Sequence, residues 1–148
     1  PLSRKVNGKT LSADVQLVPS DLGIVMESGT WTPTLQGNAN VGDPSFIKQS
    51  GTYVRIGDLV WINCDIQLSA LGGLSGAVSV GGIPFIPAEK SVLTTIYDYA
   101  KLLPLNALAE KEGFLRLTCS NTAGSWSTLV SGNITETFHL NLSGCYAV

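Results

Sequence analysis

The sequence predicts an all-β protein: a β-sandwich or barrel-like head, preceded by an extended stalk segment and assembled as a homotrimer. Apolar and polar residues alternate over the longer patterned stretches, which is the period of a β-strand, and helical periodicity is scarce. Short segments rich in Gly, Pro and Asn separate these stretches. Many short strands divided by such turns are typical of sandwiches and barrels.

The clearest predicted strand covers residues 59–68. One face holds five apolar residues and the other holds a tryptophan and three polar residues. The apolar face consists of Val60, Ile62, Cys64, Ile66 and Leu68, and the opposite face of Trp61, Asn63, Asp65 and Gln67. This alternation predicts a strand that is buried on one side.

Shorter patterns predict further strands. The apolar residues that mark them are Ile134, Phe138, Leu140 and Leu142, with Glu136 interrupting; Leu115, Leu117 and Cys119; Val78 and Val80; and the run from Val92 to Tyr99. The turn signals between strands are Gly37–Pro44, Gly72-Gly73, Pro84–Pro87 and Asn121–Gly124. The segment from Leu102 to Glu112 does not follow this scheme, and it is predicted to be either a short helix or a loop laid over the core.

Residues 1–26 differ from the rest of the chain. They are polar and rich in turn residues, and their apolar residues are too sparse to form a core within one chain. We therefore expect this segment to be a stalk that finds its apolar contacts in other chains. The sequence from Met26 to Gly29 is the natural boundary, so residues 1–26 are predicted to form a trimerisation segment and residues 27–148 the head.

The composition bears on possible partners. Charged residues make up 14% of the chain, compared with about 25% in typical soluble proteins. Ser, Thr, Asn and Gly supply the remaining polar surface, which suits carbohydrates and subunit interfaces. The net charge is −2, so the chain lacks the excess of basic residues that is typical of nucleic-acid-binding proteins, and nucleic acid is not an expected partner. No apolar run has the length of a membrane span, and membrane insertion is not expected.

The cysteines indicate where the protein is made, and the first residue indicates that the chain comes from a longer protein. Cys64, Cys119 and Cys145 are odd in number and lack C-x-x-C spacing, so they are predicted to be reduced residues of the core. Reduced cysteines fit synthesis in a reducing cytosol. The chain begins at Pro1 without an initiator Met, and we expect it to be a fragment or a processed product of a longer protein.

The N-terminal segment resembles a repeat of tailed-bacteriophage fibre proteins. Lys5 to Gly23 reads KVNGKTLSADVQLVPSDLG, which is close to a repeat with a VNGK-x-LS-x-D core and an SD-[LV]-G turn. The head is similar to a family that follows such repeats in fibres and tailspikes, through the strings GTWTPT from Gly29, GTYVRIGD from Gly51 and GIPF from Gly82. Little resemblance extends beyond Glu89.

The resemblance implies a trimeric tail fibre of the virion, made in the bacterial host cytoplasm, whose terminal domain contacts a surface receptor of the host. Such receptors are glycans, namely lipopolysaccharide or capsule, or outer-membrane proteins. Two other functions stay open at this stage. The chain is either a trimerisation or folding cap without receptor contact, or part of a polysaccharide depolymerase, which ranks last because the long repetitive strand ladder of such enzymes is absent.

The sequence offers no constellation for catalysis, so no enzymatic activity and no cofactor are expected. Glycoside hydrolysis needs two carboxyl groups across a cleft, and the acids are scattered as single surface or turn residues; Glu110 and Glu112, for instance, flank Lys111 in a charged run. His139 is the only histidine and has no motif around it. It is predicted to be solvated or hydrogen-bonded on a polar strand face; the alternative is a metal site formed by three copies of His139 around a trimer axis.

Aromatic residues beside polar groups provide the candidate receptor site. Sugar rings stack on exposed aromatic rings while amides and carboxylates bind their hydroxyl groups. Trp126, in a Ser- and Gly-rich segment with Asn121 nearby, is the first candidate, and Tyr97-Asp98-Tyr99 is the second. For Trp126 binding and packing remain even alternatives. The other two tryptophans, Trp31 and Trp61, are predicted to be packing or interface residues.

Overall fold

The computed structural model describes residues 4–10, 16–100, 105–120 and 125–148, and the side chains of these residues apart from residues 96–100. In chain order the elements are β1 (Lys5–Val6), β2 (Lys9–Thr10), the 3-10 helix η1 (Pro19–Leu22), β3 (Met26–Trp31), β4 (Thr34–Gly37), β5 (Ser45–Ile56), β6 (Leu59–Ala70), β7 (Val78–Gly81), β8 (Ser91–Ala100), β9 (Leu105–Glu110), β10 (Phe114–Ser120), β11 (Trp126–Thr128), the 3-10 helix η2 (Ser131–Asn133) and β12 (Ile134–Ala147). The all-β prediction is confirmed. Within the described ranges, neither helix has the length or the apolar character needed to cross a bilayer.

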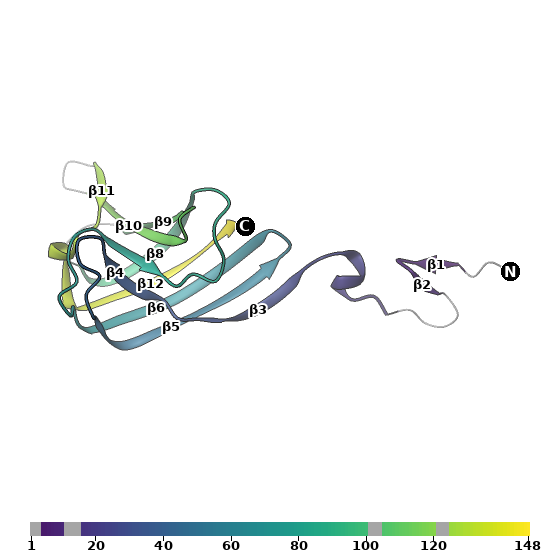
Figure 1. Ribbon diagram of the computed structural model, residues 1–148, viewed down its shortest axis with the longest axis horizontal. Coiled ribbons are helices and arrows are strands. Elements are labelled where there is room, and N and C mark those ends of the chain that lie inside the picture. Colours follow the sequence, from purple (N-terminus) through teal and green to yellow (C-terminus); the bar gives the residue numbers. More distant parts are fainter. Residues whose placement is uncertain (1–3, 11–15, 101–104, 121–124) are drawn as a thin grey trace.

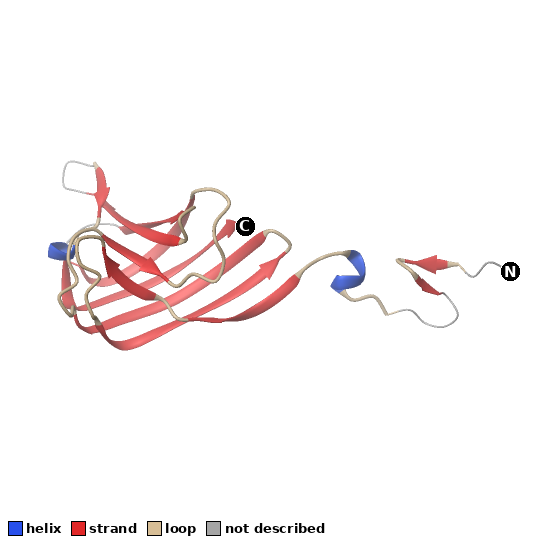
Figure 2. Ribbon diagram, in the orientation of Figure 1, coloured by secondary structure: helices blue, strands red, loops and turns tan. Residues whose placement is uncertain are grey.

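The strands from β3 onward form one antiparallel sheet that curls into a half-barrel (Figures 1 and 2). Its order is β3-β5-β6-β12-β8-β9-β10-β7-β4, and β11 pairs with the second half of β10. The sequence allowed either two packed sheets or a barrel-like sheet. The continuous pairing across all these strands selects the barrel-like alternative.

The core fills the concave side of the sheet and follows from the alternating pattern. In β6, the residues predicted to face inward are fully buried while their neighbours are partly or well exposed. β10 and β12 repeat this pattern through Leu115, Leu117, Phe138 and Leu140. Burying such side chains contributes about 1.5–3 kcal/mol each, so the alternation determines which face of each strand points inward.

Three segments, which begin at Gly29, Gly51 and Gly82, meet in one packed cluster. Trp31 is buried directly over Gly51, and its indole N–H lies 3.2 Å from the backbone carbonyl oxygens of both Thr52 and Asn63. A Cβ on Gly51 would lie 2.4 Å from the indole nitrogen, so only glycine leaves room for the ring. The predicted packing role of Trp31 is therefore what the structure shows.

The same cluster continues to the third segment. Tyr53 lies over Gly29, and its ring meets the ring of Phe85 edge-on, with centroids 5.3 Å apart. The guanidinium of Arg55 lies 5.0 Å from the Phe85 centroid, and Tyr146 donates a hydrogen bond to the Phe85 carbonyl. These three segments therefore stabilise the scaffold by packing.

Two predictions about the secondary structure and the cysteines are wrong. The segment Leu102–Glu112, predicted as a helix or loop, contains strand β9, in which Leu105, Ala107 and Ala109 face the core. Cys145 is exposed rather than buried, because it lies on the outer face of β12 opposite Trp61. All three cysteines are free, and Cys64 and Cys119 are buried as predicted.

The described part of the N-terminal segment lies away from the half-barrel in Figure 1 and has no buried residue. Asn7 (φ 46°) and Gly8 (φ 79°) form the left-handed turn between β1 and β2. Lys9 pairs with Asp21, and the Asn7 amide donates to the Asp21 carbonyl, so the hairpin is joined to η1 by polar contacts. The predicted division at residue 26 remains a prediction.

Candidate functional site

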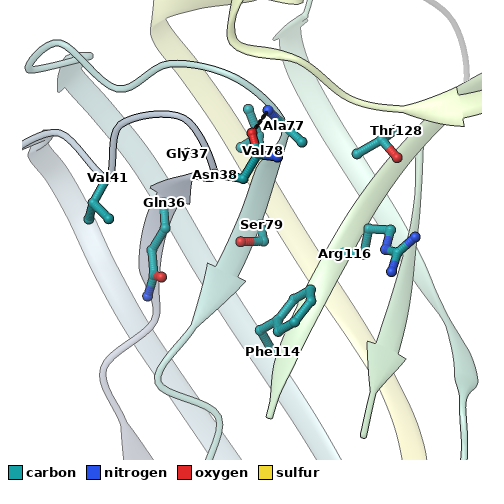
Figure 3. A pocket seen from close by; sticks show the side chains of 10 residues that line it. All are labelled: Gln36, Gly37, Asn38, Val41, Ala77, Val78, Ser79, Phe114, Arg116 and Thr128. Carbon is teal, nitrogen blue, oxygen red and sulfur yellow. Dashed lines mark hydrogen bonds between the residues drawn. The ribbon is translucent and has the colours of Figure 1, made fainter. Parts of the chain in front are cut away.

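A groove of about 580 Å³ lies on the side of the sheet opposite the core, across β4, β7, β10 and β11 (Figure 3). Its lining residues are Gln36, Gly37, Asn38, Val41, Ala77, Val78, Ser79, Phe114, Arg116 and Thr128. Grooves with a few convergent polar groups and an aromatic wall are typical binding sites. The groove is therefore the candidate functional site.

Strand register brings three polar side chains into one row on the groove floor. Gln36 of β4 pairs with Ser79 of β7, and Ser79 pairs in turn with Arg116 of β10. Figure 3 shows Ser79 between the other two. The Gln36 amide nitrogen donates to Thr34 Oγ1 at 3.0 Å, and its carbonyl oxygen has no partner among the described residues. The row thus presents an amide, a hydroxyl and a guanidinium to a ligand.

Arg116 is positioned by a carboxylate that the sequence did not single out. Glu110 is only 4% exposed, which corrects its interpretation as a surface acid of a charged run. Its Oε1 lies 2.9 Å from Arg116 Nε and its Oε2 lies 3.1 Å from Lys90 Nζ. The contact at Oε1 is ionic and lacks hydrogen-bond geometry. A buried carboxylate requires such compensation by cations.

Aromatic side chains lie along the same face. Phe114 lines the groove and lies two residues before Arg116 in β10, so the two side chains are on the same face of the strand. Thr128 lines it from β11, and Trp126 lies two residues before Thr128, roughly 7 Å along the strand. Ser127 points to the buried Cys119, with 3.9 Å between Oγ and Sγ, so Trp126 faces the groove side. Trp126 is 52% exposed.

Replacing Trp126 with alanine separates the two roles that the sequence left open. Because the side chain is half exposed, we expect the free energy of unfolding to change by about 0.5 kcal/mol or less. If Trp126 extends the ligand surface, binding to bacterial cells should weaken by about 2 kcal/mol or more. Thermal melting and cell adsorption of the same preparation measure both quantities. A large drop in melting temperature would assign Trp126 to packing.

The other predicted binding residues fall elsewhere. Asn121 lies outside the described residues. Tyr97, Asp98 and Tyr99 belong to β8, where Tyr97 pairs with Leu140 and Asp98 pairs with His139 of β12, while their side chains lie outside the described part of the structure. Strand β9 separates β8 from β10. The backbone of β8 therefore lies apart from β4, β7 and β10, and the role of these three residues stays a prediction.

His139 takes part in a polar cluster on the outer face of the sheet. Its Nε2 lies 2.7 Å from Asp65 Oδ1 and 3.3 Å from the Asn141 amide nitrogen. Burial acts to raise the pKa of Asp65, but hydrogen bonds from Lys48 and His139 outweigh it and lower that pKa. The described residues of one chain contain no group of three metal-binding side chains. A shared site of three chains remains the alternative stated above.

An apolar face occupies the outer side of β3, β5 and β6. It consists of Met26, Val54, Ile56, Leu59 and Trp61, all exposed. Met26 pairs with Ile56 and Ile56 with Leu59, while Val54 pairs with Trp61, so the five side chains form two adjacent rows. Contiguous exposed apolar residues of this kind mark interaction surfaces.

Comparison with known proteins finds a similar fold in one solved structure. No family model matches the chain. Its fold is similar to that in the crystal structure of the Dettilon tailspike protein, gp208, with a TM-score of 0.70 and 13% sequence identity. The similarity covers 82% of this chain and 24% of the tailspike chain, so this chain spans about a quarter of its neighbour's length. The half-barrel is thus a fold that also occurs within a phage tailspike.

Proposed function

We propose that this chain is the receptor-binding tip of a phage tail fibre or tailspike, a virion component made in the host cytoplasm that binds a glycan of the bacterial surface. The main support for this proposal is the groove. It places an amide, a hydroxyl and a guanidinium in one row beside Phe114. The exposed Trp126 lies on the same side of the sheet. Sugars need such hydrogen-bonding groups for their hydroxyls and apolar rings for their C–H faces.

We propose binding rather than hydrolysis. The described residues that line the groove include no Asp or Glu, whereas glycosidases of the usual kind place two carboxyl groups about 5 to 9.5 Å apart. Glu110 is engaged by Arg116 and Lys90 and is not among the lining residues. An unchanged molecular mass of purified host polysaccharide after incubation with the chain is the expected outcome. Shortened polymer would establish the depolymerase alternative.

We also propose a homotrimer in which the apolar face is covered by other copies of the chain. The apolar face continues into the N-terminal segment, where Leu22, Ile24 and Val25 are exposed as well. A hollow of about 470 Å³, lined by Pro19, Ser20, Gly23 and Ile24 to Met26, lies along this transition. Since none of the described residues of the segment is buried within one chain, neighbouring copies are its natural cover.

The proposed trimer can be tested by deleting the N-terminal segment. Light scattering should report three chains per particle for the full chain, and a stable monomer would contradict the proposal. Deletion of residues 1–26 should weaken the trimer while leaving a folded head, because the buried core residues of the described chain all lie at Trp31 or beyond it. Light scattering over a dilution series, with circular dichroism on the same samples, measures both effects. Loss of folding together with assembly would show that the boundary is wrong.

The apolar face also favours a second function, a trimerisation or folding cap without receptor contact. Binding of the isolated chain to bacteria separates the two functions. The fluorescently labelled chain should bind cells of a susceptible strain and fail to bind mutants that lack lipopolysaccharide or capsule. Binding that depends on an outer-membrane protein instead would move the receptor to that class. Absence of binding to any strain that adsorbs the phage would favour the cap.

A further inference from the structure

We propose that the groove selects an anionic saccharide, whose carboxylate or phosphate group binds Arg116. This inference rests on the glycan-binding function proposed above and adds the chemical class of the ligand. Arg116 is the charged residue among the described residues that line the groove. All of the others are neutral, so a single cation distinguishes this site from one built for neutral sugars.

The charges around Arg116 leave a positive excess. Glu110 contributes one negative charge, while Lys90 and Arg116 contribute two positive charges at 3.1 and 2.9 Å from its oxygens. The nearby Lys111 and Glu89 form a separate pair at 2.8 Å and cancel. Glu112 is exposed in the turn between β9 and β10 and does not line the groove. Within the ion-paired cluster of Glu110, Lys90 and Arg116, the charges therefore sum to one positive unit.

The geometry leaves the binding end of Arg116 available. Its Nε faces Glu110, and its two Nη atoms have no hydrogen-bond partner among the described residues. The side chain is 42% exposed, whereas that of Glu110 is 5% exposed. A guanidinium held at Nε presents its terminal N–H groups as a planar fork, which matches the two oxygens of a carboxylate or phosphate. Ser79 and Gln36 then lie in the same row for sugar hydroxyls.

The buried carboxylate explains why Arg116 does not serve charge compensation alone. Lys90 already pairs with Oε2 of Glu110 and lies outside the groove. Because Glu110 needs only one cation for neutrality, the second cation supplies charge that a ligand can use. Glu110 and Lys90 are therefore positioning residues for Arg116, and only Arg116 would contact the anion.

A glycan array with matched triplets tests this inference. Each triplet presents the same oligosaccharide with glucose, glucuronic acid or glucose 6-phosphate at one position. The wild-type chain should bind at least one acidic member about tenfold or more tightly than its neutral partner, the effect of one charge-assisted hydrogen bond or more. Preference for the uronate or for the phosphate identifies the source of the anion. Equal binding of neutral and acidic members would overturn the inference and leave the glycan-binding function intact.

Variants then assign the effect to Arg116. R116Q and K90Q each remove one positive charge from the same Glu110 cluster, but only Arg116 lines the groove. We expect R116Q to abolish the acidic preference and K90Q to retain it, with melting temperatures measured for both. If R116Q does not fold, R116K replaces it in the test. R116K keeps the positive charge beside Glu110 but lacks the planar fork of the guanidinium, so it should also lose most of the preference for acidic glycans. Equal losses in R116Q and K90Q would contradict direct contact. If the wild-type chain binds no glycan, the inference fails, and cell binding decides the function separately.

Discussion

Replacing Trp31 with alanine is expected to lower the free energy of unfolding by about 3 to 5 kcal/mol, the usual cost of removing a buried tryptophan. Trp31 is 8% exposed, packs over Gly51 and places its indole N–H toward two backbone carbonyls of the neighbouring strands. Its loss leaves a cavity and removes the hydrogen bonds of the indole N–H. Chemical denaturation at fixed protein concentration measures the change. A loss below about 1 kcal/mol would contradict the packing role, since that is the range of surface substitutions.

Gly51 provides a matched test of the same contact. Gly51→Ala should cost about 1–3 kcal/mol because the new methyl group overpacks against the indole, whose nitrogen would lie 2.4 Å away. In a Trp31→Ala background the same substitution should cost much less, because the ring is gone. Gly132→Ala is the control, since a Cβ at Gly132 meets nothing within 4 Å. Equal costs of Gly51→Ala in both backgrounds would refute the explanation.

Replacing Trp61 with lysine is expected to convert the trimer to monomers at micromolar concentration. Trp61 lies beside Val54 in the apolar face and is 43% exposed in the single chain. In the proposed trimer, the substitution removes an aromatic anchor and buries an unpaired charge in each copy. Interface anchors cost about 2 kcal/mol or more when truncated, and three symmetric copies multiply the loss. Light scattering measures the molar mass.

Val92→Lys is the matched control for Trp61→Lys. Val92 is also exposed and apolar, but it lies on β8, outside the apolar face. Cys145 gives a second readout because it lies opposite Trp61. Its thiol should react slowly in the trimer and quickly in the Trp61→Lys variant, while Cys64, whose pKa burial raises to about 12, should react in neither. Trimers of unchanged mass in Trp61→Lys would show that the copies meet elsewhere.

The sequence predicted the strands whose two faces differ most in polarity. β6 shows this best, because five buried residues alternate with exposed or half-exposed ones. β12 was predicted in spite of Glu136 on its apolar side. The structure explains this exception by a shift in register between Ile134 and His139, which leaves Glu136 exposed. β9 was missed because Ala107 and Ala109 are small, and the spacing of the leucines around them imitates a helix.

The groove could not be predicted because its parts are distant in the sequence. Gln36, Ser79 and Arg116 become neighbours only through the order β4-β7-β10, and each looks like an ordinary outward residue of its own strand. Glu110 was misjudged for the same reason, since its partners Lys90 and Arg116 come from other segments. Trp126 was found because an aromatic residue among small polar ones is a local signal. Strand alternation places it on the side of the sheet that carries the groove.

Cell binding of a chain with a filled groove tests whether the bacterial receptor is recognised in this groove. Ser79→Trp places a large ring on the groove floor between Gln36 and Arg116, whereas Thr94→Trp adds the same ring at an exposed position of β8. The labelled variants are compared with the wild-type chain on cells of the susceptible strain, with melting curves for each. We predict that Ser79→Trp abolishes binding while keeping its fold, and that Thr94→Trp binds like the wild type. Full binding by a folded Ser79→Trp variant would show that the receptor is not recognised in this groove.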